Sequence, residues 1–357
     1  MPGLRINFIL PELSATGGMN SNALIGEALA RRGHDVTLYY TDPPPPPPTV
    51  RSVVRRARRR LRGVRTTPPP RSERLSFVGV PRAEVRSDDV RDADLTIATW
   101  WETREWLEGF ADSKGQKGYF IRHLEMFAGH HERVEATYRM PGHRFVIARW
   151  LQDEMTRRGL HSDYVPNGVD RSLFFPPEAA ADRGPVVGVA YSRVGWKGTP
   201  VALRAMTEAK RAVPELECVA FGAHPLKLGQ ARPAGFAYAR YPSRAGVADH
   251  YRRARVWLLA SETEGFGMPG LEALACGCPV VATRCGGPED YVEPGRNGTL
   301  VDVGDASAMA AAIVEHVRMP GPAWRERSVH GRAVADRYDW DASAGRLLDA
   351  LDAGVPA

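Results

Sequence analysis

The stretch VWLLASETEGFGMPGLEALACGCPVVAT, residues 256–283, contains the repeating unit of the fold. It begins and ends with short apolar runs, Val256–Ala260 and Pro279–Thr283, which are typical of buried strands. Between them a glycine-rich loop leads into Pro269–Cys276, for which we predict a helix because proline is favoured in a first turn. Strand, helix and strand in this order predict a βαβ unit of a parallel sheet.

The same alternation extends in both directions from this stretch. Strands are predicted at 5–10, 36–40, 75–80, 95–100, 118–121, 145–148 and 164–168, then at 186–191, 218–221 and 236–241. Helices are predicted at 24–32, 150–158, 201–213, 247–254, 306–317, 322–338 and 340–351. We therefore predict an α/β fold of two doubly wound, Rossmann-like domains that face a central cleft, where ligands of such sheets bind.

Composition shifts suggest where the domains end. We predict a first domain at residues 1–175, a second at 176–339, and a C-terminal helix at 340–357 that crosses back to pack on the first domain. Residues 43–72 interrupt the first domain with polyproline and arginine-rich sequence. We interpret them as a solvated linker, and keep open a basic arm, 51–65, that contacts an acidic acceptor or a membrane surface.

Composition narrows the class of protein. The chain has 357 residues, 43% hydrophobic and 25% charged, with a formal net charge of +6, which suits an anionic ligand without implying nucleic acid. Its four cysteines, at 218, 276, 278 and 285, lack the spacing of a zinc site. With neither a signal peptide nor a membrane-spanning run in the sequence, we expect a soluble cytoplasmic protein, or one peripheral at the inner face of the membrane.

Two carboxylates with seven residues between them form the strongest chemical signal. Glu264 follows a predicted strand, and Glu272 lies near the start of the next helix. Gly265 and Gly267 permit a tight turn and a close approach of backbone to ligand. Carboxylates beside helix-start amides can accept hydrogen bonds from sugar hydroxyls. The alternative is that Glu264 only caps a turn and Glu272 only complements a helix N-terminus.

Weaker signals follow three other predicted strands. Arg193 and Lys197 share one strand–helix loop, where a guanidinium fork and an ammonium charge suit a diphosphate. Gly17 and Gly18 lie between the first strand and helix and can present amides to phosphate, but without the spacing of a dinucleotide-binding or Walker A loop. His123 ends another strand. Most single histidines are structural or surface residues, but at this edge of the sheet His123 would face the predicted cleft.

In these residues the chain resembles the retaining GT-B glycosyltransferases, especially family 4. Glu264–Glu272 resembles the family's EX7E motif. The flanking sequences YVPNGVD (164–170), EALACGCPVVAT (272–283) and NGTLV (297–301) are similar to family sequences as well. The resemblance covers nearly the whole chain and is weak over residues 43–72.

The resemblance implies a role for each site residue. Glu272 would hold the donor ribose, and Glu264 with the backbone of Phe266, Gly267 and Met268 would hold the donor sugar. Arg193 and Lys197 would neutralise the diphosphate, with Gly17 and Gly18 adding amides. His123 would contact the donor sugar near the reacting face. The catalytic set that the resemblance implies is thus Glu264, His123, Lys197 and Arg193.

The implied reaction moves a hexose-type sugar from a nucleotide-diphosphate sugar to a small-molecule, glycan or lipid-linked acceptor, with retention of anomeric configuration. It would serve the biosynthesis of glycans or glycosylated natural products. No cofactor and no metal are expected, and Asp92-Ala93-Asp94, although it resembles a DxD metal motif, is interpreted as a solvated turn. Same-face attack is favoured over double displacement with Glu264 as nucleophile.

Two other functions remain alternatives. One is a nucleotide-sugar epimerase or a phosphorylase on a similar fold, although Lys197 and four other lysines offer no good Schiff-base candidate for a pyridoxal enzyme. The other is a nucleic-acid binder that acts through residues 51–65, whose binding would fall steeply with salt. No nucleic-acid partner is expected. The sequence leaves the donor base, the donor sugar, the acceptor and the oligomeric state open.

Overall fold

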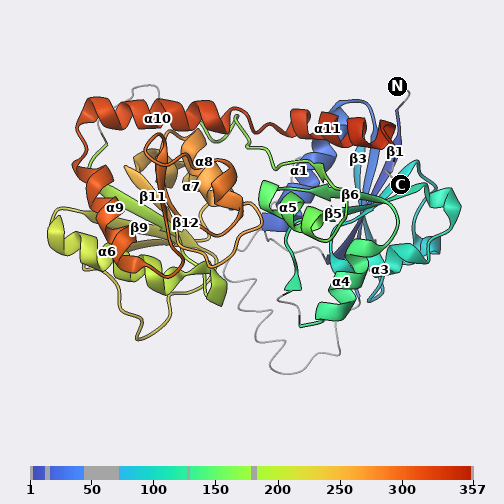
Figure 1. The fold of residues 1–357 in the computed structure, drawn as a ribbon, viewed down its shortest axis with the longest axis horizontal. Coiled ribbons are helices and arrows are strands. Elements are labelled where there is room, and N and C mark those ends of the chain that lie inside the picture. The colour runs from blue at the N-terminus through green and yellow to red at the C-terminus, as the bar shows by residue number, and fades with distance from the viewer. Residues whose placement is uncertain (1–2, 13–16, 44–71, 127–128, 178–182, 355–357) are drawn as a thin grey trace. The chain divides into compact units, whose positions relative to one another are not determined.

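A computed structural model describes residues 3–12, 17–43, 72–126, 129–177 and 183–354 (Figure 1). The predicted arginine arm at 51–65, and nearly all of segment 43–72, lie outside these residues. The chain divides into two compact units. Unit 1 comprises residues 1–147, 151–167 and 340–357, and unit 2 comprises 148–150 and 168–339. The main division thus falls between Asn167 and Gly168, ahead of the expected 175/176 boundary.

Unit 1 contains a seven-stranded parallel sheet in the order β3-β2-β1-β4-β5-β6-β7. The strands are β1 (Arg5–Glu12), β2 (Asp35–Thr41), β3 (Leu75–Val80), β4 (Leu95–Ala98), β5 (Gln116–Ile121), β6 (His143–Val146) and β7 (Asp163–Tyr164). β4 is buried throughout, as expected for a central strand covered on both faces. The chain reverses its direction of winding between β1 and β4.

Five α-helices of the described chain accompany this sheet. They are α1 (Gly17–Arg31), α3 (Trp101–Glu108), α4 (His131–Arg139), α5 (Arg149–Arg157), whose first two residues belong to unit 2, and α11 (Trp340–Asp352). α11 packs on α1, as the red and blue helices beside the sheet show in Figure 1. An ion pair of 3.0 Å joins Arg31 to Asp341, and Ser343 Oγ donates to the carbonyl of Pro166 at 2.6 Å. The C-terminal helix therefore packs within unit 1.

Unit 2 contains a six-stranded parallel sheet in the order β10-β9-β8-β11-β12-β13. The strands are β8 (Val186–Ala190), β9 (Glu217–Gly222), β10 (Ala237–Arg240), β11 (Val256–Leu259), β12 (Val280–Thr283) and β13 (Gly298–Val301). Numbered from β8, this is the doubly wound order 3-2-1-4-5-6. The predicted fold class is confirmed, and the switch in winding falls between β8 and β11.

Helices cover this second sheet as well. α6 (Thr199–Ala212) and α9 (Ala306–Arg318) pack on each other and share one apolar core with the sheet. α7 (Arg244–Arg253), α8 (Met268–Ala275) and α10 (Gly321–Ala335) complete the unit, with α10 packed on α8. Trp257 on β11 is fully buried, and a side chain at Gly188 would place Cβ 2.0 Å from its ring. Glycine at 188 therefore makes room for the tryptophan.

All four cysteines are buried, unpaired, and located in unit 2. Burial raises the pKa of the Cys218 thiol to about 11 and those of Cys276, Cys278 and Cys285 to about 12. Among the described residues, none of the helices has the length and apolar content needed to span a bilayer.

Candidate functional site

The loops that follow β8 and β11 meet at the switch point of unit 2. Lys197 ends a short 3₁₀ helix, η4 (Gly195–Lys197), and its Nζ lies 2.7 Å from Glu264 Oε1. The Lys197 side chain is 37% exposed, whereas that of Glu264 is only 10% exposed, so the pair has its cation toward solvent. Ser261 Oγ donates to the same carboxylate oxygen at 2.7 Å. The loop cation and the first acid of the EX7E sequence therefore form one cluster.

Backbone contacts hold these two loops together. The Glu262 N–H donates to the carbonyl of Trp196 at 2.7 Å, and Thr283 Oγ1 of β12 donates to the carbonyl of Ser261. Gly198 has a φ of 61° and lies directly against Ala260. Because a Cβ at position 198 would be 1.7 Å from the Ala260 oxygen, only glycine allows the loops to approach this closely.

We expect Gly198→Ala to destabilise unit 2 by about 2–4 kcal/mol, from backbone strain plus the displaced Ala260 carbonyl. Gly195→Ala is the matched control in the same loop, since Gly195 has no positive φ and a Cβ there meets no atom within 4 Å. Urea unfolding of both variants measures the difference. Equal stability of the two variants would show that the close approach is unimportant.

The loop from Glu264 to Gly267 is fixed from several directions. The Glu264 N–H donates to the carbonyl of Cys285 at 2.9 Å, and Tyr291 Oη donates to that of Gly267 at 2.6 Å. Trp150 Nε1 donates to the carbonyl of Gly265 at 3.0 Å. Two of these three contacts use loop carbonyls as acceptors and the third uses the N–H of Glu264, so the loop is held in place without occupying most of its N–H groups.

Backbone amides remain available where this loop becomes α8. The N–H groups of Phe266, Gly267 and Met268 donate to no other described residue. Gly267 has a φ of 81° and precedes the first residue of the helix, and Pro269 has no N–H to donate. The ring of Phe266 is 2% exposed and packs against Tyr291. Phe266 can therefore serve a ligand only through its backbone, as predicted for a helix N-terminus that binds oxygen anions.

Glu272 lies on α8 and is held by a buried tyrosine. Tyr251 Oη on α7 donates to Glu272 Oε2 at 3.0 Å, and the Tyr251 ring packs edge-on against Trp257 with centroids 4.6 Å apart. Burial raises the pKa of the Glu272 carboxyl to about 7, against the hydrogen bond from Tyr251 and the charge of Arg244, which lower it. Glu272 can therefore change its charge near neutral pH.

The remaining predicted residues are placed elsewhere. Arg193 is exposed in the Lys197 loop and makes no hydrogen bond or ion pair with any described residue. His123 is half-buried just after β5 in unit 1. Gly17 and Gly18 begin α1, also in unit 1. His123, Gly17 and Gly18 belong to unit 1 and Glu264 belongs to unit 2, so the central cleft that would join them stays a prediction.

Several supporting residues of this cluster had no signal in the sequence. Ser261, Tyr251 and Tyr291 contact the acids or the loop, yet none belongs to a pattern with chemical meaning. The glycine pair after Cys285 is a sequence signal for close packing against the Glu264 loop. Gly286 forms a β-bridge with Glu264, and Gly287 lies against the backbone of Phe266.

Both aspartates of the DxD sequence contact other residues of unit 1. Asp92 forms an ion pair of 3.0 Å with Lys114, and Asp94 accepts the Arg5 N–H at 2.7 Å. These contacts engage one oxygen of each carboxylate.

The chain is similar in sequence to known glycosyltransferases. Residues 185–318 match the family model described as glycosyl transferases group 1. A D-inositol 3-phosphate glycosyltransferase of Acidothermus cellulolyticus is 31% identical over 247 residues, covering 62% of this chain and 54% of the relative. A GDP-mannose-dependent alpha-(1-6)-phosphatidylinositol monomannoside mannosyltransferase of Mycolicibacterium smegmatis is 32% identical over 214 residues, covering 53% and 56%.

The chain therefore spans about half the length of the curated relatives it matches. Among solved structures, sucrose-phosphate synthase of Thermosynechococcus elongatus superposes with a TM-score of 0.74 at 20% identity, covering 98% of this chain and 99% of that one. This likeness shows the fold and nothing finer. The two doubly wound sheets and this likeness together show that the chain has the GT-B fold, and its residues 185–318 match the family described as glycosyl transferases group 1.

Proposed function

We propose that this chain transfers a hexose-type sugar from a nucleotide-diphosphate sugar to an acceptor, with retention of anomeric configuration and without a metal ion. The observation that carries the proposal is the contact of Lys197 with Glu264 at the switch point of unit 2. A cation, a buried acid and unused helix-start amides gather there. Ligands of doubly wound sheets bind at such points.

The chemistry of the leaving group explains why a cation is needed. Breaking a glycosyl–diphosphate bond leaves negative charge on phosphate and positive charge on the sugar ring. Lys197 would stabilise the departing diphosphate, with the exposed guanidinium of Arg193 as a second charge, because pre-placed charges cost no reorganisation. The amides of Gly267 and Met268 add partial positive charge.

The two acids would act on opposite ends of the donor. Glu272, with one oxygen held by Tyr251, would accept hydrogen bonds from the ribose hydroxyls. Glu264 would orient the sugar hydroxyls. Its carboxylate already accepts from Lys197 and Ser261, which suits orientation better than nucleophilic attack and supports same-face displacement.

The acceptor is proposed to be a small molecule, a glycan or a lipid-linked sugar, bound with the help of unit 1. His123 would lie near the reacting face of the donor sugar. Inositol phosphate and phosphatidylinositol mannoside relatives make polyol and lipid-linked acceptors the first to test.

A thermal-shift screen over UDP, GDP, TDP and their sugars tests donor binding. A nucleotide at 100 times its Kd stabilises the folded state by about 2.7 kcal/mol, which is a rise of several degrees in Tm. One base is expected to stand out, and Lys197→Ala should reduce its stabilising effect. No shift with any nucleotide, together with no release of nucleoside diphosphate during turnover, would refute the proposed function.

Glu264→Gln separates binding from turnover. The glutamine carbonyl still accepts from Lys197 and Ser261, so donor affinity should change less than about threefold. Turnover should fall about 10²–10³-fold, because the charge that orients the sugar in the transition state is lost. Donor Kd by calorimetry and kcat by nucleotide release measure the two effects. A large loss of affinity at unchanged kcat would assign Glu264 to binding alone.

A further inference from the structure

A buried acid follows His123 in unit 1, and none of the proposed steps uses it. Glu125 is 1% exposed and has a φ of 55°. Among the described residues, only Glu125 and Tyr241 adopt a positive φ without being glycine. A left-handed conformation is unfavourable for glutamate and persists only where surrounding contacts enforce it.

Contacts from two elements hold Glu125 in this conformation. Its Oε2 accepts the N–H of Trp101, the first residue of α3, at 2.8 Å, and Tyr119 Oη of β5 at 2.9 Å. Tyr138 Oη of α4 donates to the carbonyl of Leu124. The tyrosines also stack, with ring centroids 6.0 Å apart. The segment between His123 and Glu125 is therefore tied to β5, α3 and α4.

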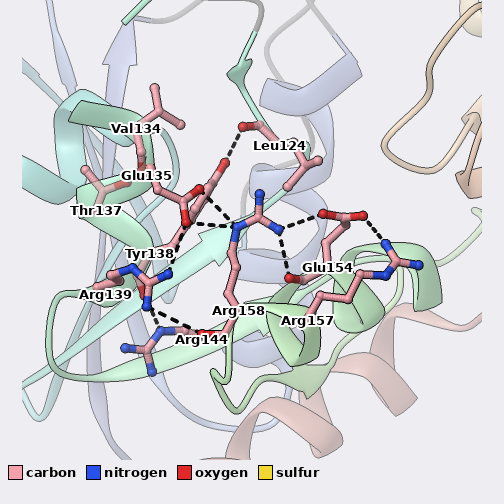
Figure 2. A network of polar contacts seen from close by, with 10 residues as sticks. All are labelled: Leu124, Val134, Glu135, Thr137, Tyr138, Arg139, Arg144, Glu154, Arg157 and Arg158. Carbon is pink, nitrogen blue, oxygen red and sulfur yellow. Dashed lines mark hydrogen bonds and ion pairs between the residues drawn. The ribbon is translucent and has the colours of Figure 1, made fainter. Parts of the chain in front are cut away.

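Figure 2 shows how Tyr138 is itself held in place. Arg158, just after α5, lies over the Tyr138 ring at 5.7 Å and reaches Glu135 at 3.0 Å and Glu154 at 2.6 Å. The arginine thus joins α4 to α5 with the tyrosine beneath it. An ordered tyrosine in turn fixes the carbonyl of Leu124.

The charge state of Glu125 is set by its burial. Burial raises the pKa of its carboxyl to about 8, which the hydrogen bonds from Tyr119 and Trp101 oppose and the charge of Glu102 on α3 reinforces. Tyr138 faces it from α4, and burial raises the pKa of that phenol as well. No described cation forms an ion pair with Glu125, and its Oε1 has no described partner. Burial therefore favours the neutral form of the Glu125 carboxyl.

We propose that Glu125 is a positioning residue that sets the backbone of the His123 segment and so directs the His123 imidazole. The inference rests on the proposed function for the role of His123, but the geometry of the segment is independent of it. The two bonds to one carboxyl oxygen offset the unfavourable backbone conformation. Removing the carboxyl lets the segment relax, whereas glutamine keeps an acceptor without a charge.

Kinetics of His123 and Glu125 variants test the coupling. Glu125→Ala should lower kcat about 10–100-fold with a smaller change in donor KM, because small misplacements of a catalytic group are costly. Glu125→Gln should stay within about threefold of wild type. In a His123→Ala background, Glu125→Ala should not lower kcat further. Equal losses with and without His123 would overturn the proposal.

The pH profile adds a second kinetic readout. As pH rises through about 8, wild-type Glu125 loses its proton and becomes an uncompensated buried charge, so kcat should fall. Glu125→Gln cannot ionise and should lack this alkaline loss. The same alkaline limb in both proteins would overturn the proposal.

A measurement without turnover separates this inference from the proposed function. NMR of the imidazole of His123, assigned by its absence in His123→Ala, reports the local geometry even if no nucleotide sugar reacts. Glu125→Ala should shift this resonance, and Glu125→Gln should not. If Glu125→Ala does not fold, Tyr138→Phe should shift it by releasing the Leu124 carbonyl.

Tyr39→Phe is the matched control, since Tyr39 is a buried tyrosine of β2 whose hydroxyl accepts the Arg91 N–H in the same unit. It should leave the His123 resonance in place. An unshifted His123 signal in Glu125→Ala, or the same shift in Tyr39→Phe, would overturn the inference while leaving donor binding untouched.

Discussion

Lys197→Ala should lower kcat/KM for the donor about 10²–10³-fold, because it removes the ammonium group that contacts the site acid and faces the diphosphate in the proposed complex. The loss should appear in both nucleotide affinity and turnover. It should also be larger for nucleoside diphosphates than for the free nucleoside, whose binding needs no cation. Calorimetry with both ligands measures the loss of affinity, and steady-state kinetics measures the loss of turnover.

Two controls sharpen this prediction. Lys210→Ala removes a lysine of the same unit whose Nζ donates to the carbonyl of Leu216, and it should leave donor affinity unchanged. Arg193→Ala should cost about tenfold, since an exposed charge interacts with a ligand through solvent. If Lys197→Ala and Lys210→Ala bind the donor equally well, the diphosphate is not held by the Lys197 loop.

Glu272→Ala should weaken nucleotide binding about 10–100-fold through the lost bonds to ribose hydroxyls. The affinity of wild type should also depend on pH. Burial raises the pKa of Glu272 to about 7, so the carboxylate is present above that pH and is protonated below it. Because the carboxylate is the stronger acceptor, nucleotide affinity should fall as pH drops from about 8 to about 6.

Tyr251→Phe provides a directional test of this pH dependence. The tyrosine hydroxyl lowers the pKa of Glu272, so its removal should move the midpoint of the affinity curve to higher pH. Glu272→Gln should flatten the curve. A pH-independent affinity in wild type, or an unmoved midpoint in Tyr251→Phe, would mean that Glu272 does not contact the nucleotide.

Strands were easier to predict than the helices of unit 1. Apolar runs such as 95–100 and 256–260 have no other interpretation in a chain of this composition, and the structure has β4 and β11 there. α3 and α4 were missed, because their sequences are polar and aromatic and lack a clear apolar period. β13 was missed for a different reason. Only four residues long and half-buried, it depends on pairing with β12.

The location of the site at one edge of a sheet could be predicted from the sequence, but the side-chain contacts within it could not. Topology places the loops after β8 and β11 together, which is why Lys197 and Glu264 were both singled out. The amino-acid sequence alone does not indicate that these two side chains, 67 positions apart, form an ion pair. The role of Tyr251 depends in the same way on how α7 packs against α8.

Because of where the cysteines lie, the opening of unit 2 can be measured separately from that of unit 1. A buried thiol with a pKa near 11 or 12 is inert toward alkylating reagents while its surroundings stay closed. Since all four thiols belong to unit 2, the rate of their modification in the intact chain reports how often that unit opens. A bound nucleotide should slow this labelling in proportion to its affinity, giving a probe of occupancy that requires neither an acceptor nor a chemical reaction.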